Sequence, residues 1–118
     1  MAEALRLVTH DLGTGGLPAP TITWVENWMT VAFADGATHG TLLHSGSSAA
    51  EVLQRVADLV HEWGVEESWS LGLGTNWPPC PDHPDSHALW VTRLGDDVAW
   101  VCPRDGRTRI PVGSLPAT

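Results

Sequence analysis

Both cysteines of the chain lie in one short stretch, together with two of its six histidines. The stretch begins Cys80-Pro-Asp-His83-Pro-Asp-Ser-His87, and the second cysteine follows at Cys102. Thiolate and imidazole are ligands that zinc favours, and a structural zinc takes four ligands in a tetrahedron. The C-x-x-H pair can enclose one side of an ion, and His87 reaches the same ion if the loop turns. The spacing therefore predicts a zinc site formed by Cys80, His83, Cys102 and, as fourth ligand, His87.

Other uses of these side chains stay open at this point. Asp105 could replace His87 as the fourth ligand, because it follows Cys102 closely. The two cysteines could instead form a disulfide or remain free thiols in a small core. As a redox pair they lack the C-x-x-C spacing of thiol–disulfide motifs. If the metal were catalytic, the available bases would be His87, Asp82 and Asp85.

Composition limits the class of protein. The chain has 118 residues, of which 42% are hydrophobic and 17% charged, as expected of a folded protein. Its formal net charge of −8 argues against a broad nucleic-acid surface. No apolar run approaches membrane-spanning length and no signal peptide is recognisable, so we expect a cytoplasmic protein without a membrane partner. Disulfides are rare in that compartment, which favours the metal over the disulfide.

Hydrophobic periodicity predicts an α+β fold with one main amphipathic helix at 49–63. Ser48 and Glu51 form a capping box before it, an apolar stripe follows, and Gly64 supplies a stop. A shorter helix at 3–12 competes with a strand in the same region. We expect one domain over 1–118, with a meander-plus-helix part at 1–73 and a zinc-ribbon-like part at 74–118.

Period-two patterns predict the strands of an antiparallel sheet, made of a meander and a C-terminal β-ribbon. We expect four or more strands in this sheet, with the main helix on one face. In the meander, Met29, Val31 and Phe33 should share a face. Trp90 and Trp100 should pack on one another in the ribbon. The expected strands are 22–25, 28–34, 37–43, 68–73, 88–94, 98–102 and 108–112.

The last third of the chain carries distinctive segments. They are Trp77-Pro-Pro-Cys80-Pro-Asp-His83-Pro, then Trp100-Val-Cys-Pro, and a tail that begins at Ile110. Together they resemble small uncharacterised actinobacterial proteins with a W-P-P-C-P-x-H-P segment, a hairpin and a W-V-C-P segment. All six basic residues are arginine, which fits coding from a GC-rich bacterial genome. The resemblance implies that the motif is a unit, and it implies no activity.

Three functions follow from these observations. We favour a non-enzymatic, acidic binding or adaptor domain with a structural zinc site, whose partner is another protein. A small metal-dependent enzyme is one alternative, and a thiol or disulfide protein without metal is the other. The chain shows no recognisable nucleophile-and-base set and no cofactor motif, so we expect no catalytic chemistry of its own. Trp77, in a rigid Trp-Pro-Pro segment, either packs on the core or serves as a binding anchor.

Overall fold

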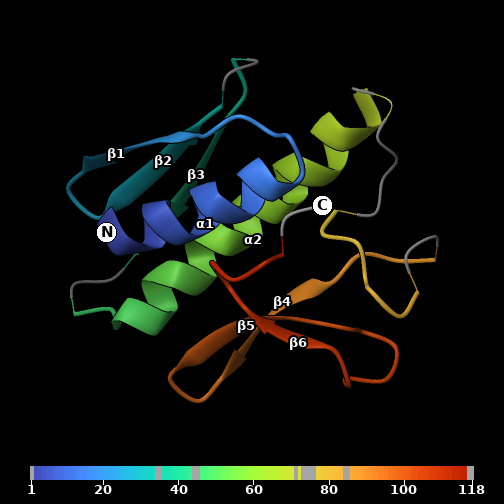
Figure 1. The fold of residues 1–118 in the computed structure, drawn as a ribbon. Coiled ribbons are helices and arrows are strands. Elements are labelled where there is room, and N and C mark those ends of the chain that lie inside the picture. Colours follow the sequence, from blue (N-terminus) through green and yellow to red (C-terminus); the bar gives the residue numbers. More distant parts are fainter. Residues whose placement is uncertain are drawn as a thin grey trace.

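In the part of the chain that the structure describes, the fold consists of two helices and two antiparallel three-stranded sheets, which confirms the α+β class. This computed structural model describes residues 2–33, 36–43, 46–70, 72, 77–83 and 86–116. The helices lie side by side between the two sheets (Figure 1). The elements are α1 (Ala2–Thr14), β1 (Thr21–Val25), β2 (Trp28–Ala32), β3 (Thr38–Leu42), α2 (Ala49–Ser70), β4 (Trp90–Leu94), β5 (Asp97–Val101) and β6 (Arg109–Pro111).

The main helix, α2, begins as predicted but ends later. The hydroxyl oxygen of Ser48 accepts a hydrogen bond from the backbone N–H of Glu51 at 3.1 Å, and the backbone N–H of Ser48 donates to the Glu51 carboxylate at 3.5 Å, so the expected capping box is confirmed. The helix runs through Gly64 to Ser70, so the stop at Gly64 was wrong. The strand expected at 68–73 was also wrong where it can be described, because 68–70 are helical. Residues 71 and 73 lie outside the described residues.

Gly64 makes room for an indole instead of ending the helix. A Cβ atom at this position would lie 2.5 Å from the ring of Trp77, which is closer than real Cβ contacts. Trp77 is buried and packs edge-on against Trp100, with ring centroids 5.5 Å apart. Trp77 was expected either to pack on the core or to serve as a binding anchor, and in the structure it packs on the core.

The sheet β1–β3 is the predicted meander. Its inner face carries Met29 and Val31, and Phe33 continues this apolar run just beyond β2, as expected; all three are buried. Phe33 stacks on Trp63 of α2 with ring centroids 4.2 Å apart, which fixes the sheet to the helix. The strand expected at 28–34 ends at Ala32, and Ala34 lies outside the described residues.

The strands of the C-terminal part form a second, separate sheet, β4–β5–β6. The prediction of a single sheet of four or more strands was therefore wrong. The expected packing of Trp90 on Trp100 was wrong as well, because Trp90 pairs with Val101 and Trp100 pairs with Val91. Adjacent residues of a strand point to opposite faces. Trp100 is consequently buried, whereas Trp90 is 59% exposed.

One buried carboxylate ties the first helix to the end of the chain. Asp11 of α1 accepts hydrogen bonds from Nε1 of Trp100 at 2.7 Å and from the backbone N–H groups of Gly113 at 2.6 Å and Leu115 at 3.1 Å. A buried carboxylate is tolerated only when such donors replace water. The hydrophobic core likewise contains residues from both halves of the chain. Among the described residues, neither helix has the length and apolar character needed to cross a membrane.

Candidate metal centre

The loop that carries three of the predicted ligands is closed at its base. Pro79 forms a β-bridge with Ala88, and the backbone N–H of Cys80 donates to the carbonyl of His87 at 3.4 Å. Within the loop, the N–H of His83 donates to the carbonyl of Cys80 at 3.1 Å. These contacts bring the first and last ligands of the loop opposite one another.

The fourth predicted ligand, Cys102, follows directly after β5. Its backbone N–H donates to the carbonyl of Thr108, and its carbonyl accepts from the N–H of Gly106, both at 3.0 Å. The hydroxyl of Thr108 donates to the carboxylate of Asp82 at 2.7 Å. Backbone pairing thus fixes Cys102 in its turn, and the Thr108–Asp82 bond fastens that turn to the other loop.

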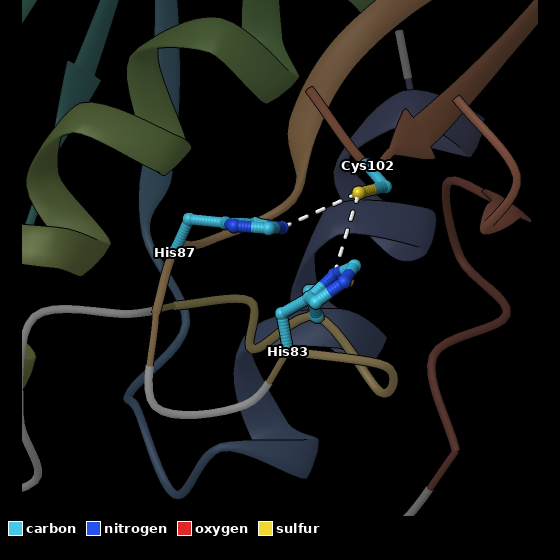
Figure 2. Close-up of side chains that lie close together, drawn as sticks. His83, His87 and Cys102 are labelled. Carbon is cyan, nitrogen blue, oxygen red and sulfur yellow. Dashed lines mark hydrogen bonds between the residues drawn. The ribbon is translucent and has the colours of Figure 1, made fainter. Parts of the chain in front are cut away.

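The structure brings all four predicted residues together. One ligand atom from each of Cys80, His83, His87 and Cys102 lies within 4.8 Å of the other three. Sγ of Cys102 is 3.3 Å from Nε2 of His87 and 3.8 Å from Nδ1 of His83. Sγ of Cys80 is 3.6 Å from the same Nδ1 atom. Figure 2 shows both imidazole rings turned towards the sulfur of Cys102.

Three of these separations are close to the edge lengths of a small coordination tetrahedron. Zinc–sulfur bonds of about 2.3 Å and zinc–nitrogen bonds of about 2.0 Å, meeting at the tetrahedral angle, place sulfur and nitrogen about 3.5 Å apart. The three sulfur–nitrogen distances given above, 3.3, 3.6 and 3.8 Å, lie on both sides of that value. Both cysteines are free and buried, and both histidines are half-buried. The cluster can therefore hold a metal ion.

The carboxylates considered at this site have other partners where they are described. Asp105 is exposed and accepts a hydrogen bond from the backbone N–H of Arg107 at 2.9 Å. This bond is the main cause that holds the pKa of Asp105 below its ordinary value, and the nearby side chain of Cys102 acts in the same direction. Asp82 is bound to Thr108. Asp85 lies outside the described residues.

A second polar site, which the sequence does not signal, is a hollow of about 280 Å³ between β3 and α2. Burial is the main cause that raises the pKa of Asp58 and lowers the pKa of His61 there. The hollow forms only where Thr41 of β3 meets the helix, and no local spacing encodes that contact. Its lining residues are Thr41, Arg55, Asp58, Leu59, His61 and Glu62.

Comparison with protein-family models, with curated proteins and with solved structures found no match. The resemblance of the last third to actinobacterial proteins therefore stays a prediction. Function has to be inferred from the geometry of the molecule itself.

Proposed function

We propose that this protein is a non-enzymatic, acidic binding domain whose C-terminal part is stabilised by a structural zinc ion. The ion would be held by Cys80, His83, His87 and Cys102. The observation that carries the proposal is the convergence of four ligand atoms within 4.8 Å of one another.

The donor set supports zinc among the common metals. Two thiolates and two imidazoles in a tetrahedral arrangement suit zinc, whereas calcium and magnesium take oxygen ligands. Thiolate ligands must be reduced, so the proposal places the protein in a reducing compartment such as the cytoplasm. Cys102 lies 15 residues beyond His87 in sequence, and an ion held between them would fix the loop at 80–87 to the end of β5.

A closed ligand set favours a structural role over catalysis. Catalytic zinc sites keep one position open for water or substrate, and structural sites use four protein ligands. Here four protein side chains are in place, and both sulfurs are buried. The carboxylate of Asp82, one of the bases considered for a metalloenzyme, accepts a hydrogen bond from the hydroxyl of Thr108.

Metal analysis of protein purified without chelator tests the proposal. We expect about one zinc per chain, and we expect Cys80→Ser to remove the metal and lower the thermal midpoint, since bound metal adds its binding free energy to folding. Arg104→Ser is the matched control, because Arg104 is exposed and lies just beyond Cys102. It should keep both zinc and stability. Metal-free protein with two titratable thiols, and with stability unaffected by chelator, would overturn the proposal.

A further inference from the structure

The outer face of the sheet β1–β3, opposite the buried side chains of Met29 and Val31, carries no charged residue at its described positions. This is unusual for a chain with a formal net charge of −8. Cross-strand pairing arranges the face in rows. The rows are Val25–Trp28–Leu42, Thr23–Thr30–Gly40 and Thr21–Ala32–Thr38.

The first row is an exposed apolar strip, which we call the Trp28 row. Val25 is 71% exposed, Trp28 48% and Leu42 53%. The indole of Trp28 lies close against Gly40, where an added Cβ atom would clash with the ring. The row therefore presents a broad aromatic surface flanked by two aliphatic side chains, and hydroxyl groups lie beside it.

The area of the Trp28 row is too small for a folded partner of the same kind. Large apolar side chains bury about 150–250 Å² each, so these partly exposed side chains offer roughly 300 Å². A patch of that size is typical of a functional surface, but a stable interface needs about 800 Å² from each partner. The area suits a short peptide segment better than a second copy of the chain.

Charge decides the chemistry of that segment. The formal net charge of −8 attracts positive partners over a distance and repels a second copy. Glu26, exposed in the turn between β1 and β2, lies next to the Trp28 row. The exposed face of an indole also binds arginine and lysine side chains through cation–π contact.

We propose that the outer face of the sheet β1–β3 binds a short basic segment of a partner protein, with an apolar anchor seated on the Trp28 row. The proposal deepens the function proposed above, because it names the partner class of the binding domain. The zinc ligands lie elsewhere, in the loop at 80–87 and at Cys102.

Selection from a phage-displayed random peptide library on the immobilised protein tests the inference. The enriched peptides, made with a fluorescent label, are then titrated by anisotropy. We expect them to be rich in arginine or lysine with aliphatic or aromatic residues, and their affinity should fall as salt rises. The double variant Val25→Ser/Leu42→Ser should weaken binding at least about 10-fold while leaving Trp28 on Gly40. Trp90→Ser changes a tryptophan on the other sheet that is even more exposed than Trp28, and it should bind as the parent does.

Each other outcome contradicts the inference. No enrichment, enrichment of acidic or neutral peptides, or equal losses in the double variant and Trp90→Ser would overturn it. A dimer in sedimentation that the double variant abolishes would assign the face to a second copy instead. Zinc content, measured on the same samples, separates the two proposals. Peptide binding by metal-free protein would contradict only the proposed zinc site. Zinc-loaded protein that binds no peptide would contradict only this inference.

Discussion

At the scale of single residues, the fourth ligand is the point that most needs a direct test. His87 and Asp105 both lie near Cys102: Nε2 of His87 is 3.3 Å from its sulfur, and the Asp105 side chain also interacts with the Cys102 thiol. The Asp105 carboxylate is exposed and accepts from the backbone of Arg107. Its depressed pKa therefore follows mainly from that turn and does not identify it as a ligand.

We expect His87→Ala to weaken zinc binding by at least about 100-fold, because loss of a direct ligand should exceed the effect of losing an outer partner. Asp105→Asn should leave the affinity within a few-fold of the parent, since it keeps an oxygen for the N–H of Arg107. Competition against a chromophoric chelator measures both. A larger loss in Asp105→Asn than in His87→Ala would identify Asp105 as the ligand.

The residues of the cluster could be named from the sequence because their spacing is local and their chemistry is distinctive. Cys80, His83 and His87 share one short loop, and only one further cysteine exists in the chain. The hydrogen bonds that hold the surrounding turns in place could not be predicted from the sequence. The bond between Thr108 and Asp82 joins two turns, and many other hydroxyl–carboxylate pairs in this chain are equally compatible with the sequence.

At the scale of elements, the local sequence pattern predicted which helices and strands form better than it predicted how they pack together. The capping box placed the start of α2, and alternation placed the strands of both hairpin regions. The division into two sheets depends on long-range packing around the helices, which periodicity does not encode. The error at Trp90 and Trp100 has a simple cause, because a one-residue difference in register moves a side chain to the other face.

Gly64 was predicted to end the main helix, but its role is to leave space for the ring of Trp77. We expect Gly64→Ala to reduce the free energy of unfolding by about 1–2 kcal/mol, because the clash with Trp77 outweighs the gain in helix propensity. Gly13→Ala is the matched control in α1, where a Cβ atom would have no neighbour within 4 Å. It should be neutral or stabilise by up to about 1 kcal/mol.

Urea unfolding followed by tryptophan fluorescence measures both changes. If Gly64→Ala were as stable as Gly13→Ala, the packing of Trp77 against α2 would be wrong. The Trp77 ring is buried between α2 and Trp100, so it has little freedom to move away from an added methyl group.

At the scale of the whole molecule, Asp11 connects three regions that are distant in sequence. Its carboxylate accepts hydrogen bonds from the indole N–H of Trp100 and from the backbone N–H groups of Gly113 and Leu115. Removing it would leave three donors without a partner, and each unsatisfied buried donor costs about 1–3 kcal/mol. Sequence reasoning did not find this role, because a single aspartate in a helix normally faces solvent.

We expect Asp11→Ala to lower the free energy of unfolding by at least about 3 kcal/mol, and Asp11→Asn to lower it less because one oxygen acceptor remains. Glu66→Ala, an exposed acidic residue of α2, serves as control and should change stability by less than about 0.5 kcal/mol. Chemical denaturation provides the measurement. Equal stability of Asp11→Ala and Glu66→Ala would show that the three bonds contribute nothing.

The bond between Asp11 and Leu115 joins residues 104 positions apart, and this has a consequence for how the chain is made. Because synthesis runs from the N-terminus, α1 leaves the ribosome well before the partners of its carboxylate. Until Gly113 and Leu115 emerge, the nascent chain cannot supply the two backbone donors that bind Asp11. A product cut short before Gly113 would keep both helices and all four residues of the Cys/His cluster, and would still lack the two backbone donors that bind the Asp11 carboxylate.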